Sequence, residues 1–407
     1  MTAQPETMPA AEYPGTRHIS SRTALVVGAG IAGLASALAL HRAGWHVDVI
    51  ERGPRLRATG GGIGITPNGM LALDALGTGA AIRRCAVVQA EGGVRTPSGR
   101  WLARTSLAFV DRRYGVGIHA LLRIDLVEIL AAALPTGTVS FGAPAELVHG
   151  GGPDRPAEVR VGGDVRSAAL VVGADGIRSG IRRVVYPLHP GLRYAGSVSW
   201  RAVVDAAGLA VVPAETWGAG LRFSVLPLGA GRVHFSAMAR MAEPADLRDR
   251  LAGLFEGWHD PIPQLLARAA GGTVHVDAIE KLAEAVDRCS IGRVVMVGDA
   301  AHPMEPNVGL ANLALEDAVE LGHALRAGDG WRELRCGLLR YEDARRTHVA
   351  SLTRMSGWMG RVAGLRSPSL VAVRNAAVRV GGLLPEAVSA RSLDAMVGWR
   401  PPPPSAQ

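Results

Sequence analysis

Lysine is almost absent from this sequence: of 44 Lys and Arg residues, only Lys281 is a lysine. The arginines are scattered, with no block of like charges, although the net charge is +8. Aromatic residues make up only 4% of the chain. Because nucleic-acid binding requires clustered basic residues and aromatic stacking positions, we expect no nucleic-acid partner. A small molecule is the expected ligand.

Cysteine is equally scarce, since the chain contains only Cys85, Cys289 and Cys336. Their odd number and wide spacing exclude a disulfide scaffold and the paired spacing of a zinc site. The histidines, among them His119 and His234, show no metal-ligand spacing either. We therefore expect a cytoplasmic protein with no metal centre.

Long apolar runs are also missing. The charge-free stretch at 24–40 is shorter than a spanning helix and contains regularly spaced glycines, so we expect no integral membrane segment. With 407 residues, 48% of them hydrophobic, the chain has material for two or three folded units and is not a disordered protein. We expect a mobile leader at 1–21 and a disordered, proline-rich tail at 401–407.

A glycine-rich motif follows directly after this leader. Residues 23–27 (TALVV) predict a buried parallel strand, and the sequence Gly-Ala-Gly-Ile-Ala-Gly at 28–33 leads into a helix at 34–42. A second strand at 47–50 ends at Glu51. In such a unit Gly28 permits the tight turn, Gly30 lets a diphosphate approach the backbone, and Gly33 lets helix and strand pack closely.

The acid at the end of the second strand narrows the type of nucleotide. Glu51 lies 23 residues after Gly28, where a carboxylate binds ribose hydroxyls and repels a 2′-phosphate. This favours FAD or NAD over NADP, although the adjacent Arg52 weakens the inference. The alternative is a glycine-rich turn that serves only packing.

Two later strands end in a carboxylate. One runs from Leu170 to Asp175-Gly176, and the other from Arg293 to Gly298-Asp299. A helix is expected from about Asn312 onward. A carboxylate at the carboxyl end of a strand, beside a helix N-terminus, is well placed to bind the hydroxyls of a sugar alcohol. Read alone, Asp-Gly is also an ordinary turn sequence.

The three motifs in this order resemble the single-component FAD-dependent aromatic hydroxylases, typified by para-hydroxybenzoate hydroxylase, including the salicylate, urate and zeaxanthin oxygenase branch. The resemblance extends from about residue 22 to 400. Residues 122–126 resemble a helix start whose arginine contacts the flavin chain, and 194–201 and 217–223 resemble strands of the substrate domain. By this resemblance FAD would be bound by Gly28, Gly30, Gly33, Glu51, Arg52, Arg123, Asp175, Gly298 and Asp299.

The resemblance also implies an activity. Members of this family are reduced by NAD(P)H, react with O2 to give a C4a-hydroperoxyflavin, and transfer one oxygen to an electron-rich ring or alkene. Asp175 and its neighbours are thought to serve both FAD and the nicotinamide cofactor. We therefore expect a monooxygenase that hydroxylates or epoxidises an aromatic or polyene/terpenoid small molecule, as a monomer or homodimer.

The chain departs from the family in the loop after Gly298-Asp299. The family reads Pro-Asn-x-Gly-Gln-Gly-x-Asn, but here Pro306-Asn-Val-Gly-Leu-Ala-Asn312 is one residue shorter. Fewer glycines restrict the backbone, which would alter the seating of the flavin ring. The residues expected to contact the cofactor in this loop are Gly309, Leu310, Ala311 and Asn312.

Three residues are candidates for work on the substrate. Glu305 stands where a small or neutral residue is usual, and a desolvated carboxylic acid can act as a general acid. Pro306 follows it, and Arg222 could meet an anionic substrate from a strand of the substrate domain. The plain alternative for Glu305 is a loop side chain in solvent. The functional alternative is an isomerase, cyclase or dehydratase derived from this family, with Glu305 as the acid.

The expected fold is α/β: a Rossmann-like FAD-binding parallel sheet with helices on both faces, a small antiparallel sheet layer that covers the flavin, and a smaller antiparallel-sheet substrate domain. The FAD-binding domain would be discontinuous, comprising 22–195 and 286–360. The substrate domain would span 196–285, followed by C-terminal helices at 361–400.

Overall fold

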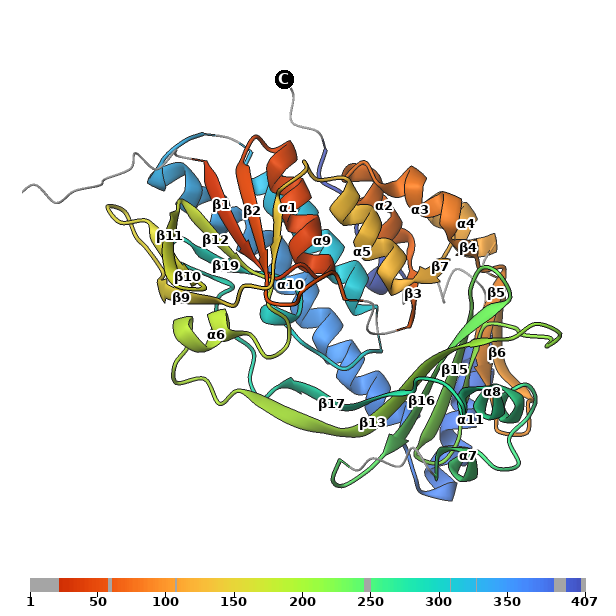
Figure 1. Ribbon diagram of the computed structural model, residues 1–407. Helices are drawn as coiled ribbons and strands as arrows, with labels where there is room; N and C mark the ends of the chain where they lie inside the picture. The colour runs from red at the N-terminus through yellow and green to blue at the C-terminus, as the bar shows by residue number, and fades with distance from the viewer. Residues whose placement is uncertain are drawn as a thin grey trace, which may run out of the picture.

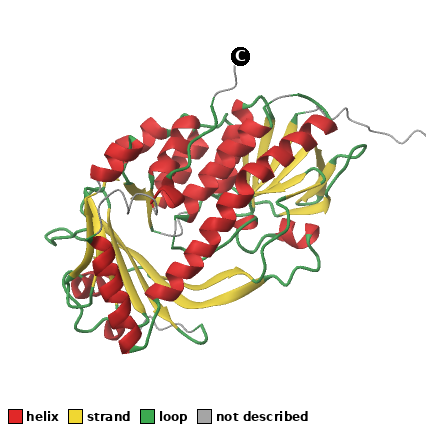
Figure 2. Cartoon of the chain, turned by 180° about the vertical axis from the view of Figure 1, so that it is seen from behind, coloured by secondary structure: helices red, strands yellow, loops and turns green. Residues whose placement is uncertain are grey.

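The computed structural model describes residues 22–57, 61–106, 108–244, 250–307, 309–326, 328–383 and 393–403. Two sheets lie at opposite ends of the molecule, with the long helix α10 (Trp331–Ala363) reaching from one to the other (Figures 1 and 2). The expected leader at 1–21 and most of the expected tail lie outside the described residues.

The first sheet is built around the strand that precedes the glycine motif. Its neighbours pair in parallel, apart from one short antiparallel edge strand. The order is β18 (Ser290–Ile291), β19 (Val294–Met296), β12 (Leu170–Gly173), β1 (Thr23–Val27), β2 (His46–Glu51), β8 (Val139–Phe141). The carboxyl ends of β1, β2, β12 and β19 therefore meet at one edge, where open α/β sheets bind ligands.

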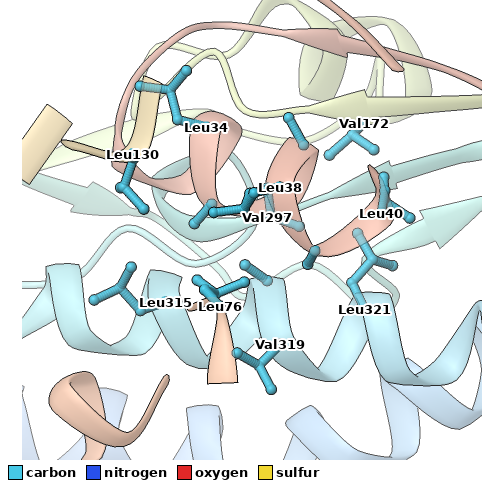
Figure 3. Close-up of a cluster of buried hydrophobic side chains, with 14 of the residues drawn as sticks. Leu34, Leu38, Leu40, Leu76, Leu130, Val172, Val297, Leu315, Val319 and Leu321 are labelled. Carbon is cyan, nitrogen blue, oxygen red and sulfur yellow. The ribbon is translucent and has the colours of Figure 1, made fainter. Parts of the chain in front are cut away.

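Helices cover one face of this sheet. Helices α1 (Ile31–Arg42), α9 (Leu310–Ala324) and α5 (Arg123–Ala132) bury their apolar side chains there. Figure 3 shows Leu38 of α1 beside Val297, with Leu34 of α1 and Leu315 of α9 in the same buried cluster. Burying side chains of this size stabilises the fold by about 1.5–3 kcal/mol each. Helices α2 (Pro67–Ala75) and α3 (Gly79–Cys85) extend the layer.

In the part of the chain that the structure describes, the other face carries no such helical layer, so the expectation of helices on both faces was wrong. A three-stranded antiparallel sheet covers it, made of β9 (Ala145–His149), β10 (Ala157–Val161) and β11 (Asp164–Ala168), with α6 (Gly180–Val185) beside it. The physical reason is that buried and exposed side chains alternate in this segment, with a period of two residues. Buried Val159 and Val161 alternate with the more exposed Glu158 and Arg160, a pattern that suits a strand and not a helix.

The second large sheet is antiparallel except for one parallel pair. Its order is β17 (His275–Leu282), β13 (Leu192–Asp205), β16 (Arg232–Arg240), β15 (Leu221–Pro227), β14 (Ala214–Trp217), β5 (Glu91–Arg95), β6 (Trp101–Ser106). Segment 217–223, expected as one strand, contains the turn between β14 and β15. Strands β5 and β6 come from a segment expected to belong to the FAD-binding domain. The domain boundaries themselves stay predictions.

One face of this sheet is buried by aromatic packing. Phe223 stacks on Phe235 at a centroid distance of 5.1 Å and meets Phe255 edge-on at 5.3 Å. Helices α7 (Leu251–Leu254) and α8 (Ile262–Ala269) complete this core. Because side chains alternate along a strand, the opposite face carries a different set of residues: Ser199, Arg201, Arg222, Ser236 and Met238.

The remaining elements are a small third sheet and two peripheral helices. The small sheet contains β3 (Gly62–Ile65), β7 (His119–Leu122) and β4 (Val87–Val88). The peripheral helices are α4 (Ala108–Tyr114) and α11 (Pro368–Gly382). Helix α10 continues through residue 360, where a boundary was expected. Among the helices of the described ranges, none combines the length and apolar character needed to cross a membrane. The α/β class with a parallel and an antiparallel sheet is confirmed.

Candidate functional site at the carboxyl edge of the parallel sheet

The turn between β1 and α1 forms the centre of this edge. Gly28 has a φ of +107°, and a Cβ there would lie 2.4 Å from the carbonyl oxygen of Ala174. A Cβ at Gly33 would lie 1.9 Å from the carbonyl oxygen of Gly28. A Cβ at exposed Gly30, by contrast, would meet no atom within 4 Å. The turn therefore leaves open space at the N-terminus of α1, the end of a helix that attracts anions.

Glu51 lies beside this turn at the end of β2. Its carboxylate accepts hydrogen bonds from the backbone N–H groups of Ala29 at 2.9 Å and Gly53 at 2.7 Å. The half-buried side chain is thus fixed next to the glycine turn, while the side chain of Arg52 is exposed. A carboxylate held in this position can accept hydrogen bonds from sugar hydroxyls.

Asp175 ends β12 and faces the same edge. One carboxylate oxygen, Oδ2, accepts from the N–H groups of Gly180 at 2.7 Å and Ile181 at 3.1 Å. The other, Oδ1, is buried without a hydrogen-bond partner in the described part of the chain. Arg182 of α6 then donates to the carbonyl oxygens of Asp299 at 3.3 Å and Ala300 at 2.8 Å. The two strand-end motifs are therefore tied together.

Asp299 lies in a short 3₁₀ turn directly after β19 and is exposed. Desolvation by the surrounding protein raises the pKa of its carboxyl group, and the nearby charges of His302 and Arg123 act in the opposite direction. Burial lowers the pKa of Arg123, the first residue of α5, while Asp299 favours its charged form. An acid and a base from distant parts of the chain thus lie near each other at this edge.

A buried ionic network supports this turn from behind. Asp317 of α9 accepts hydrogen bonds from the N–H of Gly298 at 2.9 Å, from His302 Nε2 at 2.7 Å and from Arg345 Nε at 2.8 Å. Arg345 also pairs with Glu316 at 2.8 Å. Burial alone would raise the pKa of Asp317, but His302 and Arg345 hold it below its ordinary range. The sequence did not predict this network, although adjacent acids at Glu316 and Asp317 in a largely apolar helix require buried partners.

We expect the stability of the protein to depend on the protonation of His302. Burial lowers the pKa of this imidazole, but Asp317 raises it, to a net value above the ordinary 6.5. The stabilisation is therefore complete below pH 6.5 and is lost as the pH rises through the folded-state pKa. Urea denaturation from pH 6 to 9 should show a decline in unfolding free energy that His302→Gln removes. Replacing exposed His46 with glutamine should leave the decline intact; equal slopes in all three proteins would contradict this assignment.

The shortened loop is only partly described, since Val308 and the side chain of Leu310 lie outside the described residues. Gly309 has a φ of +74° and caps the N-terminus of α9. The buried Asn312 side chain accepts a hydrogen bond from the N–H of Thr66 and donates to the carbonyl oxygen of Gly64, both at 3.2 Å. The first turn of α9, with half-buried Ala311, is therefore anchored to the β3–α2 connection.

Glu305 is paired with the only lysine of the chain. Lys281 of β17 donates to Glu305 Oε1 at 2.5 Å, and both side chains are largely buried. On α10, a Cβ at Gly360 would lie 2.1 Å from Glu305 Oε2, so a glycine makes room for this carboxylate. Ser356 Oγ donates to the Glu305 carbonyl oxygen at 2.6 Å. The expectation of a loop side chain in solvent was wrong for Glu305, but Pro306 next to it is exposed.

Arg222 of β15 reaches the same loop from the antiparallel sheet. Its Nη2 donates to Asn307 Oδ1 and to Met238 Sδ, both at 2.8 Å. Its Nε and Nη1 make no hydrogen bond within the described ranges, which leaves donors for a ligand. Ser199 and Ser236, 3.1 Å apart through their hydroxyl groups, lie on the same face. This face presents a cation, hydroxyls and a thioether to a substrate.

The histidines noted in the sequence have structural partners. His119 bonds to the Gly117 carbonyl oxygen, and His234 to that of Ala202. Burial lowers the pKa of His234 to about 4, so it is neutral at pH 7. Within the described residues, no group of three or more His, Cys, Asp or Glu side chains is arranged to hold a metal ion.

Comparison with known proteins places this geometry among flavoproteins. The family model described as "FAD binding domain" matches residues 21–252 and 256–356. The chain is 34% identical to aurachin C monooxygenase/isomerase of Stigmatella aurantiaca over 79% of its length and 85% of the relative. It is 35% identical to 3-amino-4-hydroxybenzoate 2-monooxygenase of Streptomyces cremeus, covering 75% and 79%. Klebsiella pneumoniae HpxO complexed with FAD and uric acid superposes with a TM-score of 0.83 at 27% identity, covering 92% and 97%.

Proposed function

The chain belongs to the FAD binding domain family and is an FAD-dependent oxidoreductase, and from this premise we propose that it hydroxylates an aromatic small molecule, using NAD(P)H and O2. One oxygen atom of O2 enters the ring and the other leaves as water. NAD(P)H supplies the two electrons and, with a proton from solvent, the two hydrogens of that water. Two kinds of relative are named for reactions on aromatic substrates, 3-amino-4-hydroxybenzoate 2-monooxygenase and FAD-dependent urate hydroxylase. Their names favour an aromatic over a polyene substrate for this chain.

The edge of the parallel sheet fits FAD. Open space at Gly30 suits a diphosphate, the fixed carboxylate of Glu51 suits a ribose, and exposed Asp299 beside Arg123 suits the sugar-alcohol chain. The unpartnered Oδ1 of Asp175 adds a polar atom at the same edge. When bound, FAD supplies the redox chemistry. The protein binds and orients it.

The environment of Arg222 supports the position proposed for the substrate. Arg222 is a buried cation on the face of the antiparallel sheet that lies opposite the aromatic core, here called the open sheet face. Its side chain donates a hydrogen bond to Asn307, in the loop that follows Asp299, and keeps two nitrogen atoms free to donate to a ligand. We assign it to the binding of an acidic or strongly polar ring substituent. Ser199, Ser236 and Met238 would complete this surface, and Pro306 would close it from the loop.

The test of this proposal begins with the flavin. Protein incubated with excess FAD should retain an absorption band near 450 nm, and a panel of hydroxylated aromatic acids should stimulate both NAD(P)H oxidation and O2 uptake. Arg222→Gln should raise KM at least about tenfold, the value of one charge-assisted hydrogen bond, with the flavin band unchanged. Exposed Arg166→Gln is the control. No retained flavin, or no stimulation by any aromatic acid, would contradict the proposal.

A second candidate, an isomerase using Glu305 as a general acid, is favoured by the relative named as a monooxygenase/isomerase. In the structure the Glu305 carboxylate contacts Lys281, and this ion pair would have to open to release an acid. Turnover without O2 or reductant, abolished in Glu305→Gln but preserved in Glu284→Gln, is the result expected of an isomerase. Unchanged anaerobic turnover in Glu305→Gln would exclude Glu305 as the acid.

A further inference from the structure

A cavity of about 780 Å³ lies between helix α10 and the connection from β17 to β18. Its third wall is the segment from Ala301 to Glu305, behind the turn that carries Asp299. None of Arg123, Asp299 and Arg222 lines it, so it lies apart from the residues assigned to FAD and to the aromatic substrate; the ion pair Lys281–Glu305, which holds the candidate acid of the isomerase alternative, forms part of its wall. A volume of this size is typical of small-molecule sites.

One face of α10 forms the long wall. The residues that line the cavity recur every three or four positions, which is the spacing of a single helical face: Arg346, Val349, Ala350, Thr353, Arg354, Gly357, Trp358 and Arg361. Gly357 keeps the middle of the wall open. Arg354 and Arg361 lie seven residues apart, about 10 Å along the helix axis.

The wall carries several unpaired positive charges. The side chains of Arg346, Arg354 and Arg361 of α10 and of Arg193 of β13 make no hydrogen bond or ion pair with any other described residue, and all four residues are exposed. Against them stand two acids of the lining without described side-chain partners, Glu284 and Asp287. The other charges of the lining are paired within the protein, including Lys281–Glu305 and Arg345–Asp317. The cavity therefore presents an excess of arginine donors to an incoming ligand.

The interior of the cavity is apolar. Val286, Pro303, Met304 and Val349 line it, and Trp358 leaves 57% of its surface exposed there. A large exposed ring beside arginines stabilises a bound apolar group by burial, while the guanidinium groups bind an acid. Exposed apolar surface rimmed by polar residues is typical of a ligand-binding groove.

From this combination we propose that the cavity is a second binding site, for an elongated amphipathic anion. The apolar body of the ligand lies against Trp358 and Met304, and its carboxylate or phosphate group is bound by Arg354 and Arg361. The seven-residue separation of these arginines suits either one acid group held between two guanidinium groups or two acid groups on one ligand. This site is independent of the proposed aromatic hydroxylation.

The test uses the FAD-loaded full-length protein and isothermal titration calorimetry with three probes. 2-Naphthoate has an apolar body and an acid, 2-naphthalenemethanol has the body alone, and acetate has the acid alone. We expect 2-naphthoate to bind at least tenfold more tightly than either of the others. The double variant Arg354→Gln/Arg361→Gln should weaken its binding at least tenfold, and Trp358→Ala should weaken it severalfold.

The control is a double variant that removes the same charge elsewhere, Arg166→Gln/Arg332→Gln, both exposed residues outside the cavity. It should bind 2-naphthoate like the wild type. Equal weakening in the control, unchanged binding in Arg354→Gln/Arg361→Gln, or loss of binding only in Arg222→Gln would each overturn the proposal. The last outcome would place the probe on the open sheet face. Melting temperatures and flavin spectra verify that every variant is folded.

Discussion

Gly33→Ala is expected to destabilise the protein and to abolish retention of FAD. A Cβ at this position would lie 1.9 Å from the carbonyl oxygen of Gly28 and 3.2 Å from the Cβ of Ala174, so α1 must move away from the sheet. Overpacking of a core costs about 1–3 kcal/mol, and a backbone clash belongs at the upper end. Because FAD would bind at the turn that this clash displaces, its affinity should fall by about tenfold for each 1.4 kcal/mol needed to restore the turn.

Gly30→Ala is expected to separate the two functions of the glycine motif, the packing of α1 on the sheet and the binding of the FAD diphosphate. Gly30 has a φ of −80°, which alanine also adopts, and its Cβ would enter open space. The FAD-free protein should therefore melt at the wild-type temperature, while FAD affinity falls because the added methyl group lies where a diphosphate approaches. Thermal melting without FAD and fluorescence titration with FAD measure the two effects. A Gly30→Ala protein with wild-type affinity would show that the diphosphate does not lie at this turn.

Asp317→Ala is expected to cost about 3–5 kcal/mol of unfolding free energy, the range for breaking a buried ion pair by removing one partner. The substitution leaves Arg345 with Glu316 as its one described carboxylate partner, beside a long hydrogen bond to the carbonyl oxygen of Leu313, and leaves His302 and the N–H of Gly298 without their acceptor. Asp317→Asn should cost less, because an amide oxygen still accepts hydrogen bonds. Urea denaturation of the FAD-free proteins gives these values.

The matched control for this network is Asp343→Ala, which removes an exposed carboxylate from α10. Its unfolding free energy should stay within about 0.5 kcal/mol of the wild type, as for most surface substitutions. A loss as large as that of Asp317→Ala would mean that net charge, and not the buried network, determines the stability. A small loss in Asp317→Ala itself would mean that Arg345 is satisfied by Glu316 alone.

The strands and helices at the carboxyl edge of the parallel sheet could be predicted because each of them depends on a short, continuous stretch of sequence. The expected strand at 23–27 is β1, the expected helix lies within α1, and the expected start of a helix near Asn312 is two residues from the start of α9. Apolar runs, glycine spacing and a terminal acid suffice for such units. The same local information suggested Gly28 and Glu51 for a nucleotide site, whereas the assignment of Asp175 and Asp299 to FAD came from the family resemblance.

Contacts between distant segments could not be predicted, because they depend on register. Arg222 reaches Asn307 across 85 positions of sequence, and Lys281 meets Glu305 across 24. A shift of one residue in β15 would place Arg222 in the aromatic core and Phe223 on the open face. The strands β9–β11 could not be assigned for another reason: each has only five residues and none contains a long apolar run. The single lysine was visible in the sequence, but not its partner.

Helix α10 has a mechanical consequence. Near its start, Leu338 and Tyr341 are buried in the core of the parallel sheet; at its far end the carbonyl oxygen of Leu365 accepts from the N–H of Gly220 at the β14–β15 turn. Its 33 residues span about 50 Å as one continuous rod. A rod fixed at both ends opposes any hinge between the two sheets. Substrate entry must therefore depend on rearranged connecting segments, and enlarging them should broaden the range of molecules admitted.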